Sequence, residues 1–279
     1  MCRATEEFKN AMREVGITPP EAIIGDSLLH RFKTGNKFNG AYVLHLDGHP
    51  AGYFQDYKQG IKIRWKLEGD FKPFTDAERK AYAIERKRQT EQRQAEELAK
   101  HNAAMQKAAF IWNGAKPAHA NHPYSINKYI QPHGARLSRD GELIIPLQNA
   151  KGELVSLQFI SATGKKRFLS GGLKKGCFFT LGTETNTVLI CEGFATGASL
   201  FESTGYLTVV AFDAGNLKAV AINIKSLYPS SEIVICGDND ASGVGQKAAS
   251  EAAIAINGKY IIPDIPGFDW NDMLNREVA

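Results

Sequence analysis

The C-terminal third of the chain alternates apolar and amphipathic segments, and this alternation limits the folds that the chain can adopt. The apolar segments are TVLIC (187–191), LTVVAF (207–212), EIVIC (232–236) and KYIIP (259–263), and each suits a buried strand. The stretches between them predict helices. Strands that alternate with helices form a mostly parallel sheet whose faces the helices cover. We therefore expect an α/β domain over residues 184–279.

Three further segments precede this domain. Residues 1–72 predict a small α/β unit, with an amphipathic helix in EEFKNAMREVG and two strands of AYVLHLDGHPAGYFQDY joined by a turn at Asp47-Gly48. Residues 73–109 predict a long charged connecting helix, because the run from 76 to 109 contains neither Gly nor Pro. Residues 110–183 predict a mixed basic subdomain with a hairpin in ELIIPLQNAKGELVSLQFI.

The composition of the 279 residues is that of an ordinary globular protein, with 43% hydrophobic and 23% charged residues. No apolar run approaches the roughly 20 residues that cross a bilayer, and the N-terminus has no secretory signal. The four cysteines are scattered without a CxxC pair. We expect a cytoplasmic protein that makes no membrane contact and has neither a disulfide framework nor a zinc ribbon.

Acidic residues follow the predicted strands of the C-terminal domain. Glu192 follows TVLIC, Asp213 follows LTVVAF, and Asp238 and Asp240 follow EIVIC. Carboxylates gathered at one edge of a sheet repel each other unless a proton or a cation lies between them, and oxygen ligands suit Mg²⁺ or Mn²⁺. The alternative for each Asp is a loop residue that caps the next helix, and Glu192 could equally be an exposed strand-end residue.

Two of these strand ends, VLICEGFATG and IVICGDNDASG, together resemble the toprim family of primases, topoisomerases and nucleases. The resemblance implies a toprim-like fold for residues 184–279. It also implies that Glu192 acts as a general acid or base and that Asp238 and Asp240 bind a divalent metal. The segment GFDWND matches a later acidic element of the family more loosely and adds Asp269 and Asp272 as metal candidates. Capping of a short terminal helix is an equal alternative for these two.

The region before the toprim-like domain is basic. Residues 154–183 contain no acid but five cations: Lys165, Lys166, Arg167, Lys174 and Lys175. This segment is similar to the basic subdomain of primases from bacteria, phages and conjugative plasmids. Arg136 of this chain falls where those primases often have another basic residue. Such cations can hold a template backbone and nucleoside triphosphates. The alternative is a solvated hairpin rim.

The primase resemblance covers roughly residues 108–279 and implies a nucleotidyltransferase. Its expected activity is metal-dependent synthesis of short RNA primers on single-stranded DNA, from ribonucleoside triphosphates, for the replication of phages, plasmids or other mobile elements. A replicative helicase is a plausible partner. Two alternatives stay open: a toprim-type nuclease, and a non-catalytic accessory that binds single-stranded DNA.

Many primases carry an N-terminal zinc ribbon, and the four cysteines of this chain are not arranged to build one. Aromatic and basic residues are interleaved in residues 53–66 instead. Lys62, Arg64 and Trp65 are the candidate DNA contacts there, because such mixtures can stack on bases and bind phosphates. Strand alternation predicts that half of the aromatic residues in this segment, Tyr53, Phe54, Tyr57 and Trp65, point into the core.

Overall fold

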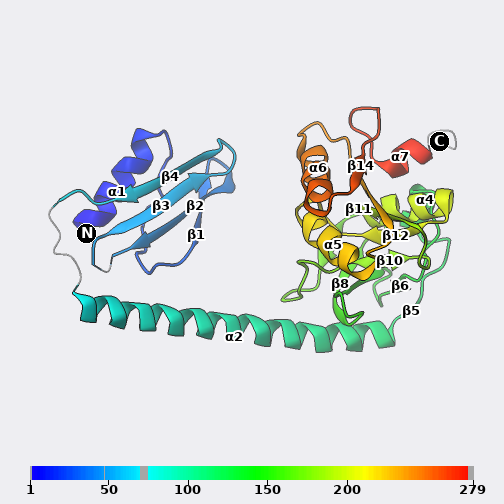
Figure 1. Cartoon of the computed structure of the whole chain (residues 1–279), viewed down its shortest axis with the longest axis horizontal. Helices are drawn as coiled ribbons and strands as arrows, with labels where there is room; N and C mark the ends of the chain where they lie inside the picture. The colour runs from blue at the N-terminus through cyan, green and yellow to red at the C-terminus, as the bar shows by residue number, and fades with distance from the viewer. Residues whose placement is uncertain (1, 47, 70–74, 276–279) are drawn as a thin grey trace. The chain divides into compact units, whose positions relative to one another are not determined.

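The structure, a computed structural model, describes residues 2–46, 48–69 and 75–275 of the chain (Figure 1). It divides into two units, Met1–Thr90 and Glu91–Ala279. The finer division predicted at residues 72, 109 and 183 stays a prediction, and Asp47 of the predicted turn lies outside the described residues. Within the described part of the chain, no helix combines the length and the apolar character needed to cross a membrane.

The N-terminal unit is a helix packed on an antiparallel sheet. Helix α1 (Arg3–Glu14) precedes the strands β1 (His30–Thr34), β2 (Lys37–His45), β3 (Ala51–Asp56) and β4 (Ile61–Lys66), which pair in the order β1-β2-β3-β4. The core lies between the helix and one face of the sheet, where Phe8 and Met12 of α1 meet Tyr42 and Phe54. The predicted helix and strand pair are both present.

Helix α2 (Asp76–Gly114) is the long charged helix that the sequence predicts, and it continues past the predicted end at residue 109. It is exposed along most of its length, and Ala104 and Ala108 are its buried residues. Side chains on its surface pair locally, as in the ion pair of Glu85 with Arg88 at 2.8 Å. Most of α2 is therefore stabilised by the helix propensity of its residues, and only its C-terminal turns are stabilised by packing.

A second antiparallel sheet follows α2. Its strands pair in the order β5 (Lys116–Pro117), β6 (Arg136–Leu137), β7 (Leu143–Gln148), β8 (Leu154–Ile160) and β9 (Lys166–Phe168), and α3 (Pro123–Asn127) lies between β5 and β6 in the chain. Strand β7 is buried on both sides: Ile144 packs with Ala104 and Ala108 of α2, whereas Leu143 and Ile145 face the third sheet. The predicted hairpin of β7 and β8 is confirmed.

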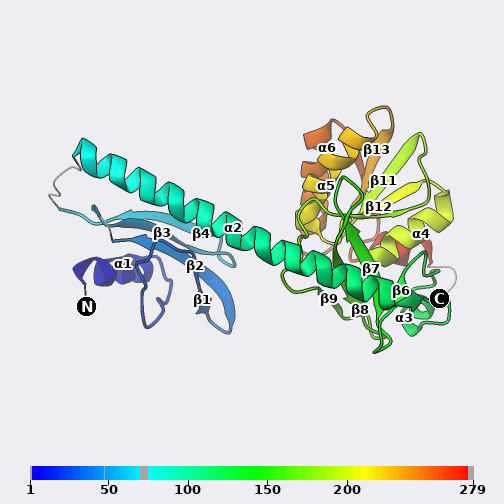
Figure 2. The same ribbon diagram turned by 90° about the horizontal axis from the view of Figure 1, so that it is seen from below.

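The third sheet is the mostly parallel one that the alternation of segments predicts (Figure 2). Its order is β10 (Phe179–Leu181), β12 (Leu207–Val210), β11 (Thr187–Cys191), β13 (Glu232–Cys236) and β14 (Lys259–Ile261), and only β10 is antiparallel to its neighbour. Helices α5 (Ala214–Leu227) and α6 (Val244–Ile256) cover one face, while α4 (Phe194–Thr204), with α7 (Trp270–Leu274) beside it, packs on the other. The predicted α/β fold class is confirmed.

Candidate functional site

The register of the central strands brings the predicted acids to one edge of the third sheet. Parallel strands β11 and β13 are direct neighbours, and their last residues, Cys191 and Cys236, lie opposite each other in the strand register. Glu192 follows the first strand immediately, and Asp238 follows the second after Gly237. Residues that follow paired positions of parallel strands leave the sheet side by side. The strand register thus brings these carboxylates to one edge of the sheet, as the sequence predicts.

Glu192 is partly buried. Its Oε1 atom is inaccessible to solvent and has no hydrogen-bond partner. Loss of hydration first, and then the negative charges of Asp238, Asp240 and Asp213, raise the pKa of this carboxyl to about 7, against a hydrogen bond from the Ala214 amide. An orphaned oxygen in a negative field is a position that a proton or a cation would stabilise.

Asp238 has similar surroundings. Its Oδ1 atom is buried without a hydrogen-bond partner. Burial first, together with the negative charges of Asp269, Asp240 and Asp272, raises the pKa of Asp238 to about 6, against the opposing charge of the nearby Lys166. Glu192 and Asp238 therefore share one electrostatic site, in which each makes ionisation of the other less favourable.

Asp240 differs, because its carboxylate is already satisfied. It accepts hydrogen bonds from the hydroxyl and the amide of Ser242, and its Oδ2 accepts one from the Gly245 amide at 2.7 Å. These bonds, that of the Ser242 hydroxyl first, hold the pKa of Asp240 below its usual value. The alternative that the sequence left open, a loop Asp that binds the N-terminus of the next helix, describes these contacts.

Gly245, in the first turn of α6, leaves open the space that these oxygens face. A Cβ atom at this position would lie 2.7 Å from the Asp238 carbonyl oxygen, 2.9 Å from Asp240 Oδ2 and 3.3 Å from Glu192 Oε1. Two carboxylate oxygens, of Glu192 after β11 and Asp240 after β13, and the backbone carbonyl oxygen of Asp238 therefore border one small gap. A hard cation prefers such a donor set, so the residues present fit a divalent ion.

The acids do not form a closed cage. Across residues 2–46, 48–69 and 75–275, no three His, Cys, Asp or Glu side chains are gathered as a ready metal site. Mg²⁺ usually binds proteins through one or two carboxylates and retains water or substrate phosphate as its other ligands. The arrangement therefore suits an ion that arrives with a substrate better than a permanently enclosed one.

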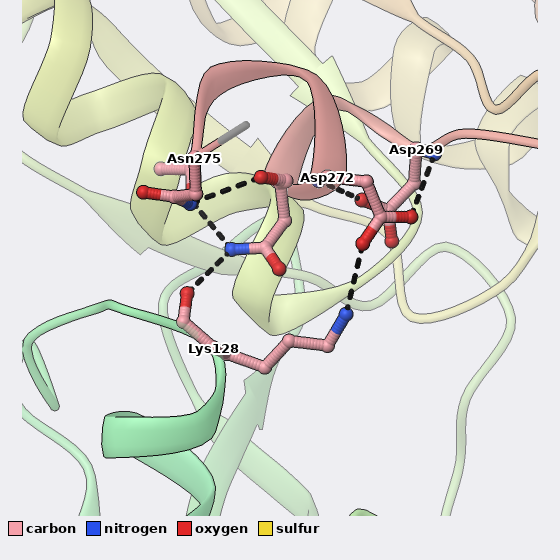
Figure 3. Close-up of polar contacts among 6 residues, drawn as sticks. Lys128, Asp269, Asp272 and Asn275 are labelled. Atoms are coloured by element: carbon pink, nitrogen blue, oxygen red, sulfur yellow. Dashed lines mark hydrogen bonds and ion pairs between the residues drawn. The ribbon is translucent and has the colours of Figure 1, made fainter. Parts of the chain in front are cut away.

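Asp269 and Asp272 cap helix α7 (Figure 3). The Asp269 carboxylate accepts from the Asp272 amide at 2.8 Å, and Asp272 accepts in return from the Asp269 amide at 3.3 Å. The ammonium group of Lys128 lies 3.4 Å from Asp272. The capping alternative thus accounts for both positions, and their effect on the site is electrostatic, since both raise the pKa of Asp238.

The predicted basic set divides between two faces of the second sheet. The ammonium group of Lys166 lies near Gly193, which directly follows Glu192: a Cβ atom added to this glycine would be 3.5 Å from Lys166 Nζ. The residue as a whole is exposed, but loss of hydration lowers the pKa of Lys166. Lys174 forms an ion pair with Asp213, the strand-end acid after β12. These two lysines lie at the acidic edge.

Arg167 and Arg136 lie elsewhere. Arg167 stacks over the Phe159 ring at 4.0 Å and pairs with Glu142, while Arg136 stacks over Trp112 at 4.4 Å and donates to the Trp112 carbonyl. Arg167 lines a groove of about 930 Å³ that also contains Lys107, Lys116 and Arg139. Lys165 and Lys175 are exposed. Consecutive residues Lys166 and Arg167 therefore serve different surfaces.

Sequence reasoning missed two residues at the acidic edge, Gly245 and Lys128. A glycine in the first helical turn after an acidic loop is a signal that could have indicated close packing against the carboxylates. Lys128 lies far from the acids in the chain, and no local pattern indicates its contact with Asp272.

In the N-terminal unit, the alternation of side chains is as expected. Phe54 is fully buried, and Trp65 packs edge-on against Phe8 with ring centroids 5.1 Å apart. The contact of Trp65 with the core argues against its predicted role in DNA binding. Lys62 and Arg64 are exposed and lie opposite Gln55 and Tyr53 in the sheet.

Comparisons with known proteins show what the chain is similar to. Residues 187–279 match the family model of the Toprim domain. Over 92% of its length the chain is 35% and 34% identical to two Escherichia coli proteins, each named DNA primase TraC, and it spans only 26% and 19% of their lengths. The solved primase fragment of the bacteriophage T7 primase-helicase protein aligns with 90% of this chain and 97% of its own, at 17% identity and a TM-score of 0.44. Residues 187–279 therefore match the Toprim domain, within a chain that is similar over most of its length to part of two proteins named DNA primase TraC.

Proposed function

We propose that the chain is a primase that synthesises short RNA primers on single-stranded DNA in a metal-dependent reaction. The observation that carries the proposal is that the Glu192 and Asp240 carboxylates and the Asp238 carbonyl oxygen border the gap above Gly245, while Asp238 Oδ1 is buried without a partner. The similarity to proteins named DNA primase supports the same activity. Because the chain spans about a quarter of the length of the first of those relatives, the activity itself stays a proposal for this chain.

In this proposal Asp238 and Asp240 would hold Mg²⁺ or Mn²⁺, and the ion would supply positive charge that offsets the charge developing on the triphosphate. Asp238 contributes an oxygen that has no other partner. Asp240 is held in position by Ser242 and Gly245, so it costs little to order. Asp269 and Asp272 stay at the helix cap and contribute negative charge rather than ligands.

Glu192 is the proposed proton acceptor for the attacking 3′-hydroxyl. A base works best when its pKa lies near the working pH, and the pKa of Glu192 is raised to about 7. Lys166 lies beside it and supplies positive charge for the triphosphate, whereas the charge of Lys174 is offset by Asp213. Arg136, Lys165, Arg167 and Lys175 are proposed to bind the template backbone.

The first experiment incubates the chain with single-stranded DNA, the four ribonucleoside triphosphates and Mg²⁺. Oligoribonucleotide products support the proposal. Shortened DNA would favour the nuclease, and a mobility shift with neither product would favour the accessory protein, so either result overturns it. A replicative helicase added to the same reaction would test whether it stimulates synthesis.

Asp238→Asn is expected to abolish synthesis, because it replaces one carboxylate oxygen with an NH2 group and removes the negative charge that would hold the ion. Template binding should stay intact or become slightly stronger. Asp240→Asn should also abolish synthesis, although its amide oxygen can still accept from Gly245. Asp264→Asn, at an exposed position of the same domain, is the matched control. Product yield is measured on gels and template affinity by fluorescence anisotropy. Full synthesis by both site variants would show that this pair is not the metal site.

A further inference from the structure

The sheet of the N-terminal unit has two chemically distinct faces. One face carries Phe32, Tyr42, Leu44 and Phe54, which pack with α1. The register places the neighbouring residues on the other face: Arg31 lies opposite Ala41, and Tyr53 opposite Arg64. We call this second surface the open face; its charged and aromatic residues are Arg31, Lys33, Phe38, Tyr53, Tyr57, Lys62, Arg64 and Lys66.

The open face is positively charged without compensating acids. Its five cations, Arg31, Lys33, Lys62, Arg64 and Lys66, are all exposed. The four strands are fully described, and the one carboxylate within them, Asp56, is 1% exposed and accepts hydrogen bonds from the Lys58 and Gln59 amides. A face with several cations and no acid attracts a polyanion.

Aromatic rings lie among these cations. The Arg31 guanidinium lies 4.6 Å from the centre of the Tyr57 ring, Lys33 Nζ 5.6 Å from that of Phe38, and Lys62 Nζ 5.5 Å from that of Tyr53. Phe38 and Tyr57 are 57% and 55% exposed, so both rings offer accessible surface beside the cations.

We infer that the open face binds single-stranded DNA. Exposed rings can stack on bases only where the bases are unpaired and unstacked, and the neighbouring cations can then bind the phosphates. Duplex DNA would offer the phosphates alone, and an acidic peptide would have no use for the rings. The surface lies on a different unit from the acidic edge, so it would bind template independently of catalysis. The choice of DNA over RNA rests on the proposed function.

The test measures binding of fluorescent oligo(dT) to the full chain, without divalent ions, over a range of salt concentrations. The double variant Lys62→Gln/Arg64→Gln is compared with Arg3→Gln/Arg13→Gln, which removes the same charge from exposed positions of α1. If both open-face cations contact phosphates, the slope of log affinity against log salt should fall by about 1.4, the value for two phosphates of a single strand. The α1 variant should keep the wild-type slope.

The aromatic contribution is tested with Tyr57→Ala, for which Tyr206→Ala on an exposed turn of the other unit is the control. Loss of one stacked base should weaken oligo(dT) binding roughly tenfold, with an unchanged salt slope. Circular dichroism verifies that each variant is folded.

Equal effects of the open-face and control variants would overturn the inference. It would also be overturned if oligo(rU), duplex DNA or polyglutamate bound the open face as tightly as oligo(dT). Failure of primer synthesis with these binding differences intact would overturn the proposed function and leave the DNA-binding face standing.

Discussion

At the scale of single residues, two carboxylates of the site respond to their surroundings in opposite ways. Three hydrogen bonds to Ser242 and Gly245 hold the pKa of Asp240 down, whereas the orphaned Oε1 of Glu192 accompanies a pKa raised to about 7. Groups whose environments separate their pKa values can take different roles in one reaction. Asp240 is suited to remain charged, and Glu192 is suited to exchange a proton.

The raised pKa of Glu192 predicts a pH-dependent stability of the metal-free chain. Between its ordinary value of 4.5 and about 7, this carboxyl binds more protons in the folded than in the unfolded state. The free energy of unfolding therefore falls as pH rises through that interval. At pH 8, Glu192→Gln should raise the free energy of unfolding by roughly 1–2 kcal/mol, after allowance for partial solvent screening. At pH 4 it should give no gain, because the Glu192 carboxyl is then neutral in the folded chain.

Hydrogen exchange of the β11 and β13 amides, measured with chelator present, reports this free energy for the unit that contains the site. Glu251→Gln, at an exposed position of α6, is the control. A Glu192→Gln variant that was less stable than wild type at pH 8 would show that Glu192 is favourably charged in the fold.

Residue roles could be predicted from sequence only where one strand determines them. The positions of Glu192 and Asp238 follow from strands that end in paired residues, so the sequence indicates their proximity. The gap above Gly245 depends on how α6 begins, and the Lys128 contact with Asp272 joins distant segments. A glycine after an acidic loop is the one local signal for the gap, and the Lys128 contact has none. Trp65, which the sequence groups with Lys62 and Arg64, packs against Phe8, because adjacent strand residues face opposite ways.

At the scale of elements, β9 shows why a basic run need not be a single surface. Lys166 lies at the acidic edge, and Arg167 lies over Phe159 beside the groove. The periodicity of the β-strands and the composition of α2 made the elements themselves predictable. The faces of a three-residue strand were not, because too few residues alternate to reveal which side is buried.

The two neighbouring cations are expected to fail differently when neutralised. Lys166→Gln should raise the KM for ribonucleotides roughly tenfold, the loss of one charge-assisted contact of about 1.4 kcal/mol, and should leave template affinity nearly unchanged. Arg167→Gln should weaken template binding and leave the nucleotide KM nearly unchanged. Initial rates at varied nucleotide and template concentrations separate the two effects. Identical behaviour of the variants would mean that both residues act at one surface.

At the scale of the whole molecule, the two units have separate hydrophobic cores. Phe8, Tyr42 and Phe54 belong to the first, and the residues of the second and third sheets share others. The boundary between the units, at Thr90 and Glu91, falls within the exposed part of α2. Sequence composition predicted this helix, but which residues belong to which core depends on contacts that no segment shows alone.

Limited digestion with trypsin should therefore cut first within residues 76–100, where α2 is exposed and rich in Lys and Arg. Two resistant fragments are expected. One ends at a Lys or Arg between residues 76 and 100, and the other contains the third sheet with its helices α4, α5 and α6. Mass spectrometry of the early products identifies the cut sites. Early cleavage inside β7, β8 or β11 instead would contradict the division into two stable units.

The opposite orientation of Lys166 and Arg167 has a consequence for insertions and deletions. Strand β9 pairs Lys166 with Ile160 and Arg167 with Phe159, across the exposed turn 161–165. One residue added to or removed from that turn, if the strands slid to absorb it, would exchange the two cations and bring a guanidinium to the acids. Exposed turns ordinarily tolerate changes of length, but this one should tolerate only changes of two residues at a time.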